Sequence, residues 1–235
     1  MNLSAEHLIT VAVIVVVTTT LVAAARLRPG RWTGYAAIVL GLLILVNEAG
    51  WWFWEFARHQ FDIRQDLPLF PCDVIAFVAP LALWFRTRML VELTYFWGIA
   101  GTANGVVSPD IGNHFPEYPF FQYFVQHGAI PAAGLFLVVG LRIAPRPWAF
   151  VKALGFAALL TVVDAFANLV TGGNYMFLRS VPPGANLLDL FGPWPYYIAG
   201  GALVAAVFFA ALDAPFRIAA LARARSRTAP YPPPA

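Results

Sequence analysis

Residues 7–25, HLITVAVIVVVTTTLVAAA, contain no Asp, Glu, Lys or Arg and are followed by Arg26, Arg28 and Arg31. A continuous apolar run of about 18 or more residues is typical of a helix that crosses a bilayer, because about 20 residues span the hydrocarbon core. Continuous runs also favour helices over a barrel, whose strands alternate apolar and polar residues. This stretch therefore predicts a membrane helix that ends at a cluster of basic residues.

Similar runs recur along the chain and predict one polytopic bundle. The 235 residues are 60% hydrophobic and only 11% charged, whereas soluble domains contain roughly 25% charged residues. The breaks between runs are too short for a separate extramembrane domain. We expect an all-α membrane helix bundle over 1–220 and a basic, Pro-rich, disordered tail over 221–235. Seven spans are predicted, at about 7–25, 33–56, 71–85, 89–107, 120–141, 149–170 and 193–213.

Basic residues are distributed unevenly between the two sides of this bundle. Of the 15 Lys and Arg residues, 12 fall in the breaks on one side and three on the other. By the positive-inside rule the N-terminus then faces out and the C-terminus faces the cytoplasm, in the plasma membrane of a bacterium. Topology and anionic lipids explain the net charge of +3 without a nucleic-acid or soluble partner, so membrane lipids are the expected partners. Two i,i+4 ion pairs, Arg88–Glu92 and Asp213–Arg217, are expected on the cytoplasmic side.

Polar residues on five of the spans lie at a common depth. At about 1.5 Å per residue from the nearest basic residue, they fall roughly 18–26 Å from the cytoplasmic boundary of a core about 30 Å thick. These residues are Asn47, Glu48, Cys72, Asn104, His127, Asp164 and Asn168. Ionisable residues at such depth usually mark function, because they are costly unless they face the bundle interior or water. We favour a shared cavity, although interhelical hydrogen bonds that only stabilise the bundle would give the same pattern.

The only cysteine lies in the segment LPLFPCD, residues 67–73. Because the span at 71–85 is short, residues 62–70 are expected to dip below the outer surface. Pro71 suits the first helical position, which puts Cys72 and Asp73 in the first turn. The amides and the positive dipole end there favour a thiolate and an oxyanion, whereas the Asp73 charge opposes a thiolate unless the amides occupy it. A lone cysteine is also an ordinary apolar filler, and both interpretations stay open.

His127 is the second candidate for catalysis. It shares a helix face with Tyr123 and lies beside Gln126, and an imidazole opposite a thiol at the same depth is a candidate base. A lone helical histidine can equally be a satisfied core residue. The chain has no HxxxH pair, so neither a metal nor another cofactor is expected. The loops on the same side, which contain Asn174 and Tyr175, are placed to roof a cavity.

Several segments together resemble one membrane family. They are residues 67–73, 92–98, Ser108-Pro109-Asp110, 120–128, 173–178 and 187–197. Over about residues 35–215 the chain looks like the YwaF-like integral membrane family, which includes eukaryotic transmembrane protein 164. The eukaryotic branch is described as a lipid acyltransferase that uses a cysteine acyl-thioester with a histidine partner. The resemblance implies Cys72 as nucleophile and His127 as base, although Phe70-Pro71 departs from the pattern expected in relatives.

Functions of different classes remain open. The favoured one is a membrane-embedded acyltransferase acting on phospholipid or lysophospholipid, or a lipase where water accepts the acyl group. The polar residues expected to orient the histidine or bind substrate are Glu48, Asp73, Asn104, Gln126, Asp164, Asn168, Asn174 and Tyr175. The alternative is a small-molecule transporter or ligand-binding membrane protein, although no inverted repeat is visible. A metal-dependent hydrolase is the third and weakest possibility.

Overall fold

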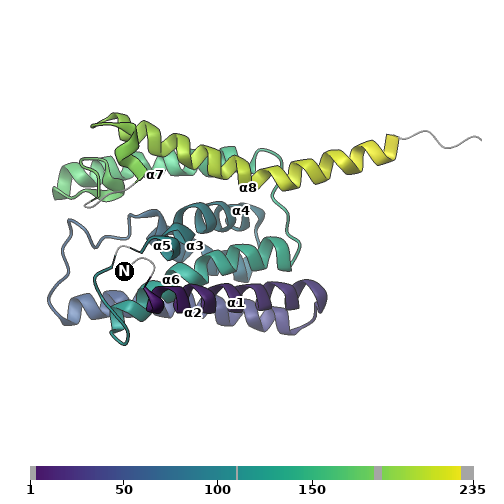
Figure 1. The fold of residues 1–235 in the computed structure, drawn as a ribbon, viewed down its shortest axis with the longest axis horizontal. Coiled ribbons are helices and arrows are strands. Elements are labelled where there is room, and N and C mark those ends of the chain that lie inside the picture. The colour runs from purple at the N-terminus through teal and green to yellow at the C-terminus, as the bar shows by residue number, and fades with distance from the viewer. Residues whose placement is uncertain (1–3, 110, 183–186, 229–235) are drawn as a thin grey trace, which may run out of the picture.

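The computed structural model describes residues 4–109, 111–182 and 187–228, and all regular elements in these ranges are helical (Figure 1). They are α1 (Ala5–Leu27), α2 (Trp32–Ala57), α3 (Pro71–Phe85), α4 (Arg88–Trp97), η1 (Gly98–Thr102), α5 (Ala103–Val107), α6 (Tyr118–Leu135), η2 (Phe136–Gly140), α7 (Ala149–Thr171), η3 (Tyr175–Phe177), η4 (Leu187–Phe191) and α8 (Tyr196–Thr228). Asp110 and the end of the predicted tail, residues 229–235, lie outside the described residues.

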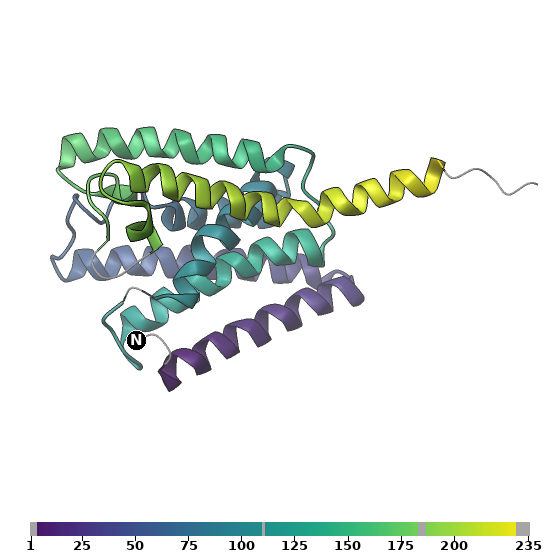
Figure 2. The ribbon, with the colours of Figure 1, turned by 45° about the horizontal axis from the view of Figure 1, so that its top comes forward.

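The helices form three tiers in Figure 1. The upper tier contains α7 and α8, the middle one α3, α4 and α5, and the lower one α1, α2 and α6. Contacts join α3 to α2 and α4, α4 to α7, and α7 to α8, while α6 contacts α1, α2, α3, α4 and α5. Figure 2 shows α1 at the edge of the bundle. The centrally placed α6 therefore positions side chains between several neighbours.

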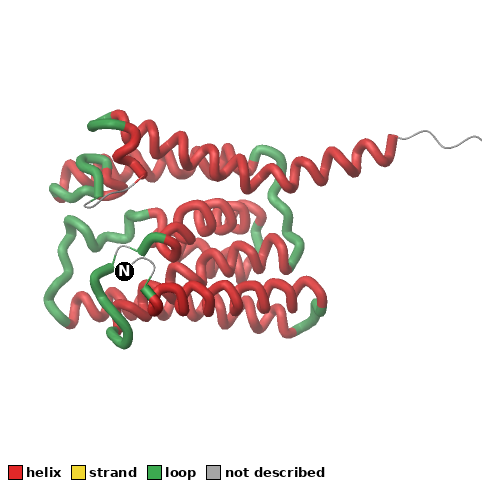
Figure 3. Tube along the Cα trace, viewed as in Figure 1, coloured by secondary structure: helices red, strands yellow, loops and turns green. Residues whose placement is uncertain are grey.

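Longer loops gather at one end of the bundle, as Figure 3 shows in green. This end, which we call the N-terminal end, carries the start of α1 and the loops at 58–70, 111–117 and 172–182. The opposite end has the shorter connections at 28–31, 86–87 and 141–148. The loop sequences noted above thus lie together at the end where α3 and α6 begin.

Most helices agree with the predicted spans. Within the described ranges, five are long and apolar enough to cross a membrane, namely α1, α2, α6 with η2, α7 and α8. The helix α3 has the short length expected from the sequence, Pro71–Phe85. The span predicted at 89–107 consists of α4, the π-helical η1 and α5. An all-helical membrane bundle is confirmed, while the count of seven spans and the outward N-terminus stay predictions.

The last helix is longer than predicted. The sequence predicts an end near residue 213, but α8 continues to Thr228 and includes the first part of the segment expected to be a tail. Ala, Leu and Arg are strong helix formers, so the helical hydrogen bonds continue beyond the apolar run. Figure 1 shows this extension projecting past the other helices.

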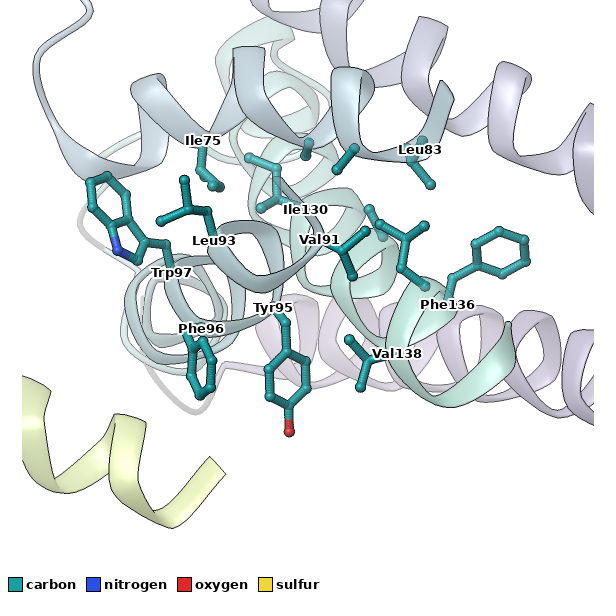
Figure 4. Packing of buried hydrophobic residues seen from close by; sticks show 14 of the residues in the cluster. Ile75, Leu83, Val91, Leu93, Tyr95, Phe96, Trp97, Ile130, Phe136 and Val138 are labelled. Atoms are coloured by element: carbon teal, nitrogen blue, oxygen red, sulfur yellow. The ribbon is translucent and has the colours of Figure 1, made fainter. Parts of the chain in front are cut away.

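The hydrophobic core lies where α3, α4 and α6 meet (Figure 4). Ile75 of α3 and Ile130 of α6 are fully buried there. Gly134 allows α6 to approach α4 closely, because a Cβ at this position would lie only 3.1 Å from the Cα of Tyr95. The Tyr95 hydroxyl reaches across to α8 and donates to the Leu212 carbonyl at 3.2 Å. Small residues on α6 therefore set the helix spacing that holds the site.

Two ion pairs lie near the other end of the bundle. Asp213 Oδ2 and Arg217 Nε are 3.0 Å apart, which confirms that predicted pair. The predicted Arg88–Glu92 pair is wrong, because Glu92 instead accepts two guanidinium bonds of 2.9 and 2.8 Å from Arg146. In this bidentate geometry each oxygen of the Glu92 carboxylate accepts a hydrogen bond from the guanidinium. We infer that this arrangement is more favourable for Glu92 than a pair with Arg88, one turn earlier on the same helix. Hydrogen bonding to Glu92 also raises the pKa of Arg146 above its ordinary value.

Candidate functional site

A polar cavity of about 390 Å³ lies at the N-terminal end of the bundle, between α2, α3 and α6. Its lining includes both residues predicted to be catalytic and three of those predicted to bind substrate: Glu48, Cys72, Asp73, Gln126 and His127. The other lining residues are Trp51, Ile111, Gly112, Asn113, Pro119, Gln122 and Tyr123. The volume is within the range of about 300–1,000 Å³ that is usual for small-ligand sites.

The thiol of Cys72 is held by the carboxyl group of the next residue. Phe70 is the extended N-cap of α3 and Pro71 is its first helical residue, as the sequence predicts. Cys72 Sγ lies 3.4 Å from Asp73 Oδ1, so the thiol donates to this oxygen. Asp73 Oδ2 accepts the Phe70 N–H at 3.2 Å. One carboxyl group therefore caps the helix and also retains the thiol proton.

The first turn of α3 offers fewer free amides than the sequence suggests. Pro71 has no N–H, and the Asp73 N–H donates to the Phe70 carbonyl at 2.9 Å. Within the described residues, the Cys72 N–H has no backbone acceptor, and the Gln122 side-chain amide, which lines the same cavity, has no hydrogen bond. Among the described residues, the donors available for an oxyanion thus include one amide of α3 and one side chain of α6.

The imidazole of His127 is fixed in one tautomer by its own helix. Its Nδ1 lies 2.9 Å from the Tyr123 carbonyl oxygen, and because a carbonyl only accepts, Nδ1 carries the hydrogen. In the neutral ring Nε2 is then the basic nitrogen. Tyr123 stacks on the ring at 4.0 Å between centroids and donates its hydroxyl to the Gly105 carbonyl at 3.1 Å. Gly105 leaves room for the imidazole, since a Cβ there would lie 3.0 Å from Nε2.

The thiol and the imidazole face the same cavity without bonding to each other. Cys72 donates to Asp73, and the hydrogen bond that His127 makes within the described part of the chain is to Tyr123. Catalytic hydrogen bonds are often looser in a resting site than with substrate bound. The thiol and the imidazole therefore line one cavity, and each hydrogen-bonds to a neighbour in its own helix.

Glu48 and Gln126 form a clamp between α2 and α6. Both side chains are buried, and the Gln126 amide donates to Glu48 Oε2 at 2.9 Å. Asn47 donates to Gln126 Oε1, also at 2.9 Å. The oxygen and nitrogen of the Gln126 side chain are thus both engaged by α2. These two predicted site residues form a wall of the cavity and also join the helices that enclose it.

Asn168 and Tyr175 lie outside the cavity and hold the segment before Cys72 through a chain of hydrogen bonds. The Asn168 amide bonds both the N–H and the carbonyl of Tyr175, at 2.7 and 3.0 Å. The Tyr175 hydroxyl donates to the Ile63 carbonyl at 2.8 Å and accepts the Leu67 N–H at 3.0 Å. This chain of bonds connects α7 to the loop that leads into α3. The two residues therefore position the loop and do not line the cavity.

A local turn completes this loop. Asp66 Oδ2 accepts the Asp62 N–H at 2.6 Å, and Asp62 Oδ1 accepts the Arg64 N–H at 2.9 Å. Burial raises the pKa of Asp66, while the Asp62 amide acts in the opposite direction. The turn gives residues 62–66 a fixed shape. Whether the segment lies below the membrane surface stays a prediction.

The structure does not bring three other predicted residues to the cavity. Asn104 is exposed on α5, and Asn174 closes its own loop through the amides of Arg179 and Ser180. Asp164 is fully buried in α7, and neither carboxyl oxygen has a hydrogen-bond partner in the described residues. In the same ranges, no three His, Cys, Asp or Glu side chains gather as a metal-ligand set.

Sequence reasoning missed part of the site. Gly105, Gln122 and Trp51 were not among its candidates, although the first contacts the imidazole and the other two line the cavity. Gln122 lies four residues before Gln126, so helical periodicity alone could have found it. Trp51 follows Glu48 at i+3 and could have been found in the same way. Gly105 has no local signal, because its role depends on the contact between α5 and α6.

Comparison with known proteins identifies the family of this chain. No curated protein and no solved structure matches the chain. The TMEM164 family matches residues 2–213, a range that contains every lining residue of the cavity. Since the match covers far more than half of the sequence, this integral membrane protein belongs to the TMEM164 family.

Proposed function

We propose that the protein is a membrane-embedded lipid acyltransferase that carries the acyl group on Cys72 as a thioester. The observation that carries this proposal is the cavity that Cys72 and His127 both line, together with the hydrogen bond that leaves Nε2 as the basic nitrogen of the imidazole. Family membership supports a membrane protein, and the lipids of the bilayer are the substrates that reach such a cavity. In this proposal, the protein lies in the plasma membrane of a bacterium.

The first half of the reaction forms the thioester. His127 Nε2 takes the thiol proton of Cys72, and Sγ bonds to the carbonyl carbon of a phospholipid ester. The negative oxygen of the tetrahedral intermediate accepts hydrogen bonds from the Cys72 N–H and the Gln122 amide. When the carbon–oxygen bond of the ester breaks, the imidazolium returns its proton to the leaving alkoxide. The products are a lysolipid and an acyl group on sulfur.

The second half transfers the acyl group. His127 Nε2 takes the proton of an acceptor hydroxyl, and that oxygen attacks the thioester carbon. The carbon–sulfur bond breaks, and the thiolate recovers the proton from the imidazolium. Asp73 Oδ1 then accepts the restored thiol again, as in the resting structure. A lysolipid as acceptor gives a transferase, and water gives a lipase.

The experiment follows the acyl group. Purified protein incubated with a phospholipid labelled in its acyl chain is expected to gain label that hydroxylamine removes, since that reagent cleaves thioesters and leaves amides intact. The chain has a single cysteine, so Cys72→Ser and Cys72→Ala are expected to lose this label entirely. His127→Ala is expected to slow labelling by about 10²–10⁴-fold, the usual loss for a general base.

The labelling experiment has a control variant and a result that would refute the proposal. Asn104→Ala changes an exposed polar residue on α5, outside the cavity, and is expected to label at the wild-type rate. Thermal unfolding in the same detergent establishes that each variant is folded. A folded Cys72→Ala protein that keeps full lipid-remodelling activity would overturn the proposal. It would instead favour ligand binding or transport through the polar cavity.

A further inference from the structure

A second, much larger hollow lies on the other face of α6. It has a volume of about 740 Å³ and is bounded by α1, α2 and α6. Its walls include Val13 and Val17 of α1, Leu43 of α2, and Phe124 of α6. The helix α6 directs Phe124 and Gly128 to this hollow and Tyr123 and His127 to the polar cavity. The two spaces are therefore separated by one helix, and we call this second one the apolar groove.

The apolar groove is held open because α1 is fixed along its length. Near the N-terminal end, His7 Nε2 lies 2.8 Å from the Val106 carbonyl oxygen. In the middle, a Cβ at Gly128 would lie 3.1 Å from Ile14, so α1 and α6 already touch there. At the other end, a Cβ at Gly140 would lie 3.1 Å from the Ala25 side chain. These three attachments hold α1 against α5, α6 and η2, and the groove remains between α1 and α2.

The shape and chemistry of the groove identify what fills it. Its lining on α1 extends from Glu6 to Leu21, which at about 1.5 Å per residue is roughly 22 Å along the helix. Water does not enter apolar cavities, and an unfilled one loses van der Waals contacts along its walls. Val13 and Val17 are 55% and 60% exposed, so the groove opens sideways to the surrounding lipid.

We propose that the apolar groove holds an acyl chain of a resident membrane lipid. The chain lies along α1, between α1 and α2 and against α6, with the lipid headgroup at the N-terminal end. There the polar lining consists of Glu6 and Thr10, and the Glu6 carboxylate already binds the Phe115 amide and His114. This lipid is separate from any substrate at Cys72, and the proposal does not depend on acyl transfer.

The test uses the whole protein in nanodiscs of phosphatidylcholine that contain a photoactivatable, diazirine-bearing acyl chain. After irradiation, mass spectrometry maps the labelled peptides. Labelling is expected to concentrate on residues 9–21 of α1 and 120–132 of α6. Equally lipid-exposed positions of α8, such as Leu203 and Val207, are expected to gain little label. Even labelling of all lipid-exposed helices would mean annular lipid only and would overturn the proposal.

Two matched variants sharpen the test. Val17→Trp fills the groove, whereas Val16→Trp makes the same exchange at a neighbouring position that is 63% exposed and outside the groove. Because an indole at position 17 occupies the space of the acyl chain, Val17→Trp is expected to reduce labelling of residues 120–132 about tenfold. Val16→Trp is expected to leave it unchanged. Equal labelling of the two variants would contradict a lipid in the groove.

The remaining outcomes separate this lipid from the thioester and from a second protein copy. The lipid is non-covalent, so Cys72→Ala is expected to retain wild-type labelling of α1 and α6. Loss of the label in Cys72→Ala would assign the lipid to the polar cavity and overturn the proposal. The mass of the particle is expected to correspond to one copy per nanodisc. A particle mass of two copies, together with loss of lipid label from α1, would show that a second copy covers the groove and would overturn the proposal.

Discussion

A methyl group added at Gly105 tests whether the position of the His127 imidazole matters for chemistry. The Cβ of Gly105→Ala would lie 3.0 Å from His127 Nε2 and 2.9 Å from the Tyr123 hydroxyl, and it would also contact His127 Cδ2. Carbon contacts at optimal separation are about 3.5–4.0 Å, so the ring must move by roughly 1 Å. The Nδ1 bond to the Tyr123 carbonyl opposes this movement.

The expected effect on chemistry is large and the effect on folding is small. A displacement of about 1 Å at a catalytic group can reduce a rate by about 10²-fold. In a helix, Ala is favoured over Gly by about 1 kcal/mol, which offsets part of the cost of moving the ring. Gly105→Ala is therefore expected to unfold within a few degrees of the wild type and to form the Cys72 thioester about 10²-fold more slowly.

Gly101→Ala is the matched control. It lies one turn earlier in the same helical stretch, and a Cβ there meets nothing within 4 Å. The labelled-phospholipid assay, run on both variants beside thermal unfolding, is expected to show the wild-type rate for Gly101→Ala. If Gly105→Ala forms the thioester as fast as Gly101→Ala, the position of the imidazole is not important and its role as base is refuted.

Three further substitutions test how the site and the opposite end of the bundle are supported. Gln126→Leu removes the donor to buried Glu48 and is expected to lower the free energy of unfolding by about 1–3 kcal/mol; an unchanged denaturation midpoint would mean that the clamp contributes nothing. Tyr175→Phe removes two hydrogen bonds to the loop before Cys72, so amide exchange over residues 61–70 is expected to accelerate while α7 stays protected; equal exchange in both proteins would contradict this. Arg146→Met leaves buried Glu92 without its guanidinium partner and is expected to lower the unfolding temperature, whereas Arg88→Met is expected to leave it unchanged.

The helices could be predicted from the sequence because each apolar run has the length of a span. Even the short α3 was predicted, since Pro71 favours a helix start and Arg86 marks the end of the apolar run. The end of α8 was not predicted, because hydropathy reports where a helix leaves the membrane and not where its hydrogen bonds stop. The Arg88–Glu92 pair failed for a similar reason, since Arg146 approaches from a loop distant in sequence.

The site could be predicted only in part. Counting residues gives the depth of a side chain in the membrane, but it does not give the side of the helix on which that side chain lies. Counting residues from the basic ends placed Cys72 and His127 at one level, and both line the polar cavity. The same counting placed Asn104 there, yet this residue is exposed. The π-helical η1 lies just before it, and its wider turn changes the direction of every later side chain. Gly105 therefore meets His127 where the sequence suggested Asn104.

Asp73 and His127, two ionisable residues that line the cavity with Cys72, are unequal as positions for testing catalysis. Asp73 caps the Phe70 amide and accepts the Cys72 thiol with the same carboxyl group. A substitution of Asp73 therefore removes both the cap of α3 and the acceptor of the thiol. A resulting change in thioester formation cannot be attributed to either one alone. His127 binds a carbonyl of its own helix through Nδ1 and lines the cavity. Because its loss leaves the start of α3 intact, a change in thioester formation there reports on proton transfer.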